Sequence, residues 1–377
     1  MTSTNRVPPE LLAKPAAERL AYFRGKVVAH PLLVSVYEQL QTLIHEPAGV
    51  SLVFVFGPTG VGKSTLCQRL EQRMTEQALA ESALHPGRLP LVRVEAVAPE
   101  TGNFNWKDFY HRALEACYEP LVEQKLDITA RNGASNRHIR LNQTKPNLAE
   151  LSRAFESCLK HRQLDAFIID EATHLGKVTS GRRQLDQMDK LKSLANLTQT
   201  LLILVGTYEL LHLTNLNGQL SRRSADIEFP HYRFENPEDA RNYKGVLHTF
   251  EQHLPLPSPP DLVADYAYFY ERSLGCVGIL KDWLLRSLAD ALAHDAPTID
   301  RACLDRNALS DFKLLQNARE IQAGNLLLAD RKERMGDIRA ALGMRPLAPT
   351  TRPLASQPKR TRVGTRNPGR DPVGGKP

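Results

Sequence analysis

Short apolar runs alternate with amphipathic stretches along the first two thirds of the chain. Each apolar run has the length of a strand, and each amphipathic stretch repeats its apolar residues at the spacing of a helix. Strands buried on both faces of a parallel sheet read as continuous apolar runs. The alternation therefore predicts an α/β fold, a parallel sheet sandwiched by helices. The predicted strands are 51–56, 89–97, 165–170 and 200–207, and 226–230 is a candidate for one more at the sheet edge.

The amphipathic stretches predict helices at 30–44, 64–80, 105–124, 147–162 and 184–198. A polar stretch from about 127 to 146 has few apolar anchors, so we expect a loop or an insertion there. After about residue 230 the strand pattern fades, and helical patterns run from 262 to about 342.

Proline clusters and polar segments mark the predicted domain boundaries. We expect a flexible N-terminus at 1–16, the α/β domain with a helical lead-in at 17–250, a small helical lid domain at 251–344, and a disordered basic tail at 345–377. The tail has seven prolines and few large apolar side chains, so burial cannot offset the entropy of ordering it.

The positive charge is confined to that tail. The whole chain of 377 residues has a formal net charge of +7. The tail holds eight basic residues and one acidic residue, so it accounts for the entire excess and residues 1–344 are neutral overall. Any binding of nucleic acid by the folded part would therefore need a local basic stripe.

Composition excludes several classes of protein. The chain is 42% hydrophobic and 24% charged, and it has no apolar run long enough to cross a bilayer and no apolar signal sequence. We therefore expect a cytoplasmic protein. The five cysteines, none in a CxxC pair, are expected to be buried free thiols rather than a disulfide framework or a zinc site.

A glycine-rich turn follows the first predicted strand and opens a helix. It reads "GPTGVGKST" and matches the pattern GxxxxGK[ST]. Such a turn directs successive backbone N–H groups at phosphate oxygens, and the helix dipole favours the negative charge. We expect Lys63 to reach the terminal phosphates of ATP and Ser64 to coordinate Mg²⁺. Within this turn, the residues predicted to bind nucleotide are Gly57, Pro58, Thr59, Gly60, Val61, Gly62, Lys63, Ser64 and Thr65.

A second acidic site is expected across the sheet, since the metal must also be held from another strand. The run "AFIIDE" supplies it. Asp170 at the strand end is predicted to be a Mg²⁺ ligand, and Glu171 a general base that orients and deprotonates water. Glu171 is the reason to predict hydrolysis rather than binding alone.

This combination resembles the AAA+ ATPases. The resemblance implies that Thr207, at the end of "LLILVGT", senses the terminal phosphate. One of Arg222 and Arg223, in "LSRRS", would be an arginine finger that reaches the ATP of a neighbouring subunit. Lys281, in "GCVGILKDWLL", would be a second sensor from the lid, and Asp170 and Lys281 complete the set predicted to bind nucleotide. A finger of this kind makes activity depend on a homo-oligomer.

Within the AAA+ proteins, the chain is similar to the TnsC/TniB transposition regulators, relatives of MuB. The shared segments are "HPLL", "NFNWKDFYHRALEA", "IIDEATHL", "LLILVGTYELL" and the lid motif. The resemblance implies a bacterial ATPase that forms a helical filament or ring on duplex DNA, recruits transposase subunits of the TnsA/TnsB kind, and receives a target selector of the TniQ/TnsD kind, sometimes with a CRISPR effector. Hydrolysis would disassemble it.

Candidate DNA contacts gather in and after the aromatic helix. They are Lys107, Arg131, Arg137, Arg140 and Lys145, and a solvated polar insertion is the alternative for them. The neighbouring rings Trp106, Phe109 and Tyr110 are expected to pack in the core, because duplex DNA hides its base faces. The tail is a further candidate for holding DNA or docking the transposase, with a solubilising linker as its alternative.

Two other classes share most of these motifs. An AAA+ replication initiator or helicase loader would carry a winged-helix module after the lid, and residues 300–344 are too short and too helical for one. A small-molecule kinase would transfer phosphate to an acceptor other than water, which Glu171 and the lid motif disfavour.

Overall fold

The structure is a computed structural model. It describes residues 7–80, 87–99, 102–124, 146–176, 181–214, 222–333 and 335–344. Contacts divide the chain into two units, Met1–Leu327 and Leu328–Pro377. The first unit holds the sheet and every element discussed below, including the first part of α14 (Asp311–Glu333), and α15 (Met335–Ala341) belongs to the second. In the described ranges, no helix combines the length and the apolar character that crossing a membrane requires.

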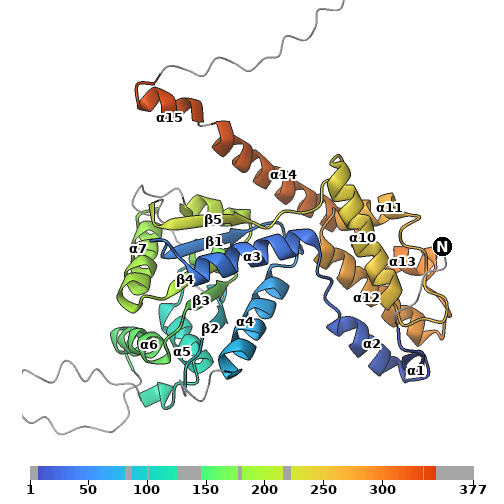
Figure 1. Ribbon diagram of the computed structural model, residues 1–377, viewed down its shortest axis with the longest axis horizontal. Helices are drawn as coiled ribbons and strands as arrows, with labels where there is room; N and C mark the ends of the chain where they lie inside the picture. Colours follow the sequence, from blue (N-terminus) through green and yellow to red (C-terminus); the bar gives the residue numbers. More distant parts are fainter. Residues whose placement is uncertain are drawn as a thin grey trace, which may run out of the picture. The chain divides into compact units, whose positions relative to one another are not determined.

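Five parallel strands form the sheet of the first unit (Figure 1). In chain order they are β1 (Leu52–Phe56), β2 (Leu91–Glu95), β3 (Ala166–Asp170), β4 (Leu201–Gly206) and β5 (Ser224–Glu228). Their order across the sheet is β2-β3-β4-β1-β5. The predicted α/β class is confirmed, and so is the fifth strand at the sheet edge, which begins two residues before the predicted range.

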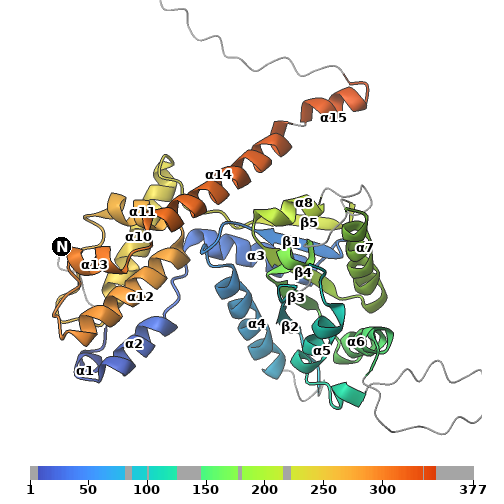
Figure 2. The same cartoon turned by 180° about the vertical axis from the view of Figure 1, so that it is seen from behind.

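Helices cover both faces of this sheet. They are α3 (Pro31–His45), α4 (Lys63–Ala80), α5 (Trp106–Ala116), α6 (Leu148–Arg162) and α7 (Gly181–Thr198). Side chains of α3 and α4 pack with Ile168 of β3 in one core cluster. The next residue, Phe167, meets the rings of Phe109 on α5 and Phe155 on α6. Because successive strand residues point to opposite faces, α5 and α6 lie on the face opposite α3 and α4. Figures 1 and 2 show these helices from the two sides.

The helix predicted at 105–124 ends earlier than its pattern suggests. It stops at Ala116, and Val122–Gln124 is a separate 3-10 turn. Tyr118 and Leu121 between them have left-handed backbones, with φ of 57° and 53°. Pro120 is the physical reason, because a proline disfavours helical geometry in the residue before it.

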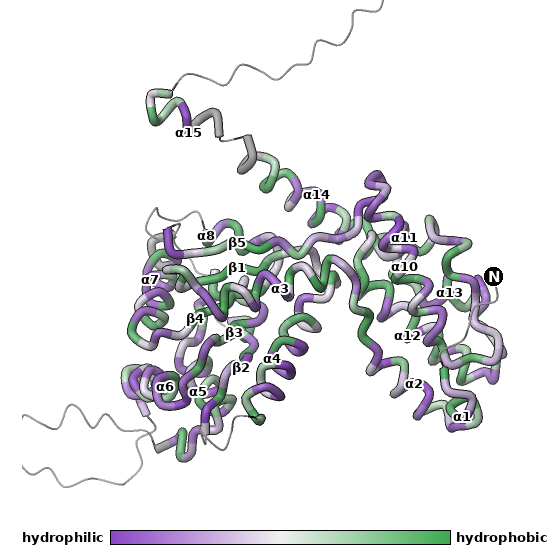
Figure 3. The backbone as a smooth tube through the Cα atoms, in the orientation of Figure 1, coloured by the Kyte–Doolittle hydropathy of each residue, from purple (hydrophilic) through white to green (hydrophobic). Residues whose placement is uncertain are grey.

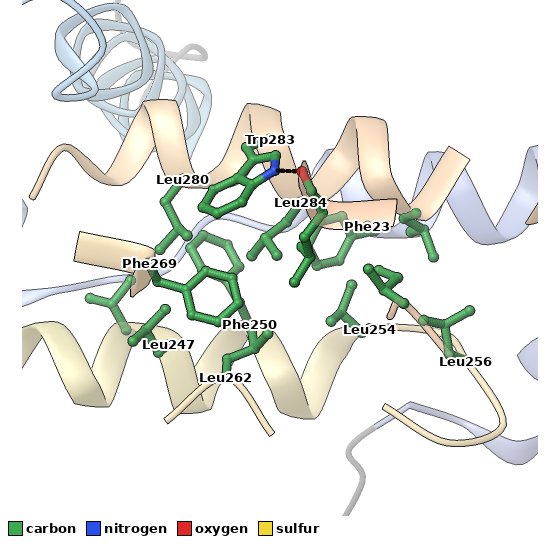
Figure 4. Close-up of a cluster of buried hydrophobic side chains, with 14 of the residues drawn as sticks. Phe23, Leu247, Phe250, Leu254, Leu256, Leu262, Phe269, Leu280, Trp283 and Leu284 are labelled. Atoms are coloured by element: carbon green, nitrogen blue, oxygen red, sulfur yellow. Dashed lines mark hydrogen bonds between the residues drawn. The ribbon is translucent and has the colours of Figure 1, made fainter. Parts of the chain in front are cut away.

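A second core is built mainly from helices, with loop residues such as Leu256 and Leu262. It joins α2 (Ala16–Gly25), α10 (Pro237–His253), α11 (Tyr266–Ser273), α12 (Val277–Ala293) and α13 (Arg301–Asn307). Figure 4 shows the cluster, in which Trp283 donates its indole N–H to the carbonyl of Leu304 at 2.8 Å. Phe23 of α2 packs on Phe250 of α10, with ring centroids 5.9 Å apart. Two helices that precede the proline cluster at 254–261, α2 and α10, thus share a core with three helices that follow it.

A short helix, α1 (Pro9–Leu12), precedes α2 within the stretch expected to be flexible. Hydrophobic and hydrophilic residues alternate along the helices (Figure 3), as the spacing of apolar residues indicates. The predicted polar insertion at 127–146 falls almost entirely outside the described residues, and the predicted tail at 345–377 does so completely.

Substitution of one buried and one exposed phenylalanine tests how much the helical core contributes to the free energy of unfolding. Phe250 is 1% exposed and Phe312 is 78% exposed. We expect Phe250→Ala to lower the free energy of unfolding by about 3–5 kcal/mol, because it leaves a cavity in the core. The matched Phe312→Ala should change it by less than about 0.5 kcal/mol. Urea unfolding followed by circular dichroism measures both, and equal effects would contradict this assignment of the core.

Candidate functional site

The glycine turn lies at the carboxyl end of β1 and leads directly into α4, as predicted. Gly60 has φ of +76°, a left-handed conformation that residues with a Cβ rarely adopt. Gly57 lies so close to the carbonyl of Phe229 that a Cβ there would collide with it. The Gly60 carbonyl accepts a hydrogen bond of 3.1 Å from the backbone N–H of Ile279 at the start of α12. The turn is therefore held between the sheet and the helical core.

The Lys63 ammonium folds back onto this turn. Its Nζ donates to the carbonyls of Gly57 and Pro58, each at 2.9 Å. Burial lowers the pKa of Lys63 below its usual value, and the carboxylates of Glu320, Glu171 and Asp170 oppose that shift. The ammonium thus sits among acidic groups with its donors on carbonyls, an arrangement that suits a cation able to move onto phosphate oxygens.

Asp170 and Glu171 lie where β3 ends. Asp170 is 5% exposed. One of its carboxylate oxygens accepts the Glu171 backbone N–H at 3.0 Å, and the other accepts Nη1 of Arg93 at 3.3 Å. Glu171 has φ of 51°, a left-handed backbone for a residue with a side chain. Strain of this kind gathers at functional sites.

Arg93 on β2 is a residue that the sequence reasoning missed. Its guanidinium lies between Asp170 and Glu71 of α4, with Nε 3.7 Å from the Glu71 carboxylate. The available signal was a charged residue in the middle of the strand "LVRVE", with apolar residues on either side of it. Burying a charge inside a sheet costs free energy unless the charge is paired, so Arg93 is expected to have an acidic partner.

Thr207 follows β4 and caps the short 3-10 turn Tyr208–Leu210 by accepting the backbone N–H of Glu209 at 3.4 Å. Because β4 lies between β3 and β1, Thr207 emerges beside both other turns. Thr59, Glu171 and Thr207 line one cavity of about 790 Å³. The structure thus brings together the turn, the carboxylates and Thr207.

The opposite wall of this cavity comes from α14. The helix contributes Lys313, Gln316, Asn317, Glu320, Ala323, Gly324 and Leu327. None of these residues was expected at the site, because nothing in their local pattern distinguishes them from the rest of a helix.

A second, smaller cavity of about 40 Å³ lies on the other side of the turn. It is lined by Val27, Val28, His30, Leu33, Val61, Gly62, Thr65, Phe250, Val277, Gly278 and Lys281. His30 bonds the Tyr232 hydroxyl at 2.9 Å, and burial lowers its pKa to about 4, so it is neutral at pH 7. A mostly apolar pocket beside a phosphate turn has the character of a site for a flat aromatic base, although it would have to widen to admit one.

Lys281 lies in this smaller cavity and not among the residues that line the cavity of Glu171 and Thr207. Its Nζ donates to the carbonyl of Arg24 at 2.8 Å, and burial lowers its pKa. The structure therefore places it on the side of the turn away from Glu171 and Thr207.

Arg222 and Arg223 lie at the opposite end of the strands, where β1 and β5 begin. The Arg223 carbonyl accepts the backbone N–H groups of Ser51 and Leu52, where β1 begins, at 2.9 and 3.2 Å. Its Nη1 donates to Asn196 Oδ1 at 3.0 Å. Both arginines line a third cavity, of about 580 Å³. A strand's length of about 17 Å separates them from the chain's own glycine turn, so they do not belong to that site.

Of the candidate DNA contacts, the structure describes only Lys107, which is exposed on α5. Arg131, Arg137, Arg140 and Lys145 lie outside the described residues. Phe109 and Tyr110 are buried, as expected. Lys190 of α7 lies over the rings of Trp106 and Tyr110, 4.5 and 4.9 Å from their centroids. The five cysteines are buried free thiols, and no cluster of possible metal ligands occurs among the His, Cys, Asp and Glu residues that are described.

Comparisons with known proteins agree with this architecture. Residues 48–214 match the family model described as an AAA domain. The ORC2 protein of Aeropyrum pernix in its ADP form has a TM-score of 0.50 at 13% sequence identity, covering 76% of this chain and 71% of that one. The ORC1 protein of Aeropyrum pernix, in complex with DNA, has a TM-score of 0.52 at 18% identity, covering 78% and 68%. Among curated proteins, none matches the sequence.

Identities this low show the fold alone. The glycine turn, Asp170, Glu171 and Thr207 all lie within the region that matches the AAA domain. The chain therefore has the P-loop AAA+ fold, with its candidate site at the carboxyl ends of β1, β3 and β4.

Proposed function

We propose that this protein is an ATPase that binds duplex DNA, assembles on it as a homo-oligomer, and acts as a nucleotide-controlled switch in DNA transposition. One observation carries the proposal. Thr59, Glu171 and Thr207 line one cavity at the carboxyl ends of the strands, while Arg222 and Arg223 lie at the amino ends. Each subunit thus has most of a hydrolysis site at one end of the strands and two arginines at the other.

The residues present fit ATP and Mg²⁺. The glycine turn offers backbone N–H groups at a helix N-terminus, and Lys63 is poised on the Gly57 and Pro58 carbonyls. Ser64 and Asp170 offer the oxygen ligands that Mg²⁺ prefers. Mg²⁺ would neutralise phosphate charge. Arg93 holds the Asp170 carboxylate in place from β2.

Glu171 and Thr207 supply what hydrolysis needs beyond binding. Glu171, which lines the cavity, would accept a proton from the attacking water. The Thr207 hydroxyl, beside it on the next strand, would donate to an oxygen of the terminal phosphate. An arginine from a neighbour would stabilise the charge of the transition state, so hydrolysis would depend on assembly.

The role in transposition rests on the segments shared with the TnsC/TniB regulators. The partners implied are the transposase, a target selector, and duplex DNA held by backbone contacts. The alternative is a replication initiator or helicase loader, which the similarity of the fold to the two archaeal ORC structures favours. In the described part of 301–344, all regular structure is helical and no strand occurs, which disfavours a winged-helix module there.

Imaging tests the proposal as a whole. Electron micrographs of the purified protein with duplex DNA and a non-hydrolysable ATP analogue should show multimers on the DNA, and ADP should give fewer. Absence of multimers with the analogue would overturn the assembly role. Recruitment of a replicative helicase rather than a transposase would favour the alternative.

Two substitutions separate binding from hydrolysis. We expect Lys63→Ala to weaken ATP binding by roughly 10- to 100-fold, because it removes a charged hydrogen-bond donor. Glu171→Gln should keep ATP affinity, lower the rate of hydrolysis by roughly 100-fold or more, and trap assemblies on DNA. A fluorescent ATP analogue and a phosphate-release assay measure the two effects. Equal loss of ATP affinity in both variants would contradict this division of roles.

A mixing experiment tests the arginines and identifies which one acts. If one of Arg222→Ala and Arg223→Ala removes the finger, its ATPase rate should fall by roughly 1,000-fold, whereas the other variant serves as the control. Adding Glu171→Gln subunits, which are inactive but carry both arginines, should restore ATPase activity to the finger variant, because its own site is intact. No recovery above the sum of the separate rates would exclude action between subunits.

A further inference from the structure

The polar face of α14 meets the glycine turn through one carboxylate. Glu320 accepts the backbone N–H of Thr59 at 3.3 Å, and it accepts the Thr59 hydroxyl with both of its oxygens, at 3.2 and 2.9 Å. Thr59 and Glu320 are 261 residues apart in the sequence. A backbone N–H of this turn is the kind of donor that a P-loop offers to phosphate, and here a side-chain carboxylate engages it.

Packing holds α14 in this position. Ile321 is buried against Cys276 and Ile279, at the start of the helix that also bonds Gly60. Gly324 lies so close to the ring of Tyr208 that any side chain there would collide with it. Near the start of α14, the Asp311 carboxylate pairs with Arg272 at 2.7 Å. Glu320, Gly324 and Leu327, which line the cavity together, lie four and three residues apart, so one face of α14 covers the site.

The charges show what the carboxylate competes for. Among the charged groups that act on the partly buried Lys63 ammonium, Glu320 has the largest influence, ahead of Glu171 and Asp170. A terminal phosphate needs the same ammonium and the same turn. Two anions that share one cation and one set of donors repel each other, and the repulsion is strong where water is partly excluded.

We propose that α14 is a built-in competitor for nucleotide, in which the Glu320 carboxylate stands in for the terminal phosphate and must leave when ATP binds. The proposal rests on the nucleotide site proposed above. Glu320 lines the same cavity as Glu171 and Thr207 and lies away from the base pocket, so it opposes ATP more than ADP. Departure of α14 also uncovers Glu171 and Thr207 for the arginine of a neighbour, which links nucleotide binding to assembly.

Removing one charge tests the competition. Glu320→Gln keeps the length and the helix propensity of the side chain and removes only the negative charge. We expect the full-length variant to bind a fluorescent ATP analogue roughly tenfold more tightly, the size of one charged hydrogen bond, with little change for ADP. Gln322→Ala, at an exposed position of the same helix, is the control and should match the wild type. Unchanged or weaker ATP binding by Glu320→Gln overturns the proposal.

A second measurement follows α14 itself. Ile321→Cys places a thiol in the buried contact of α14, and Cys276→Ser in the same variant removes the native thiol that this contact also covers. The other four native cysteines are buried elsewhere. Alkylation of the introduced thiol by iodoacetamide should quicken with a non-hydrolysable ATP analogue and not with ADP. A rate that the analogue leaves unchanged or slows overturns the displacement. A wild-type protein that binds neither nucleotide would instead refute the nucleotide site, so the two failures are distinguishable.

Discussion

The parallel pairing of β3, β4 and β1 is the constraint on which the site depends. The register sets Phe56 beside Gly206 and Ile169 beside Leu204, so three strands end at one edge of the sheet within a residue or two of each other. Each next residue is then a site residue: Gly57, Glu171 after Asp170, and Thr207. Both faces of these strands are buried, and a slip of one residue would turn every side chain to the other face. The register is therefore strongly specified, and with it the geometry of the cavity.

A second constraint joins the glycine turn to the helical core. The start of α12 donates its Ile279 N–H to Gly60, and the rest of α12 is built into the core that holds Phe23, Phe250 and Trp283. The same helix buries Ile321 of α14. A change at the turn therefore acts on both the helical core and α14 through one element. This is a physical route by which occupation of the site can act on the helical core.

The candidate catalytic residues and the two arginines lie at opposite ends of the strands. The turn, the carboxylates and Thr207 occupy the carboxyl edge, and Arg222 and Arg223 occupy the amino edge. Ion pairs also support the carboxyl ends of the strands, because the Arg93 guanidinium lies between the carboxylates of Asp170 and Glu71. Burying a carboxylate that is only 5% exposed costs free energy, and a paired guanidinium offsets that cost.

By itself the sequence determined the sheet, the glycine turn and the strand-end residues, because buried strands and phosphate turns leave local patterns of apolar runs and glycines. It also indicated most helices, although Pro120 ended α5 sooner than the apolar spacing implied. The tertiary structure alone decided that Arg93 pairs with Asp170, that Lys281 lines the smaller cavity beside the glycine turn, and that Glu320 covers Thr59. Each of these contacts joins segments far apart in the chain, and the spacing of residues within one helix or strand carries no record of what a distant segment will bring against it.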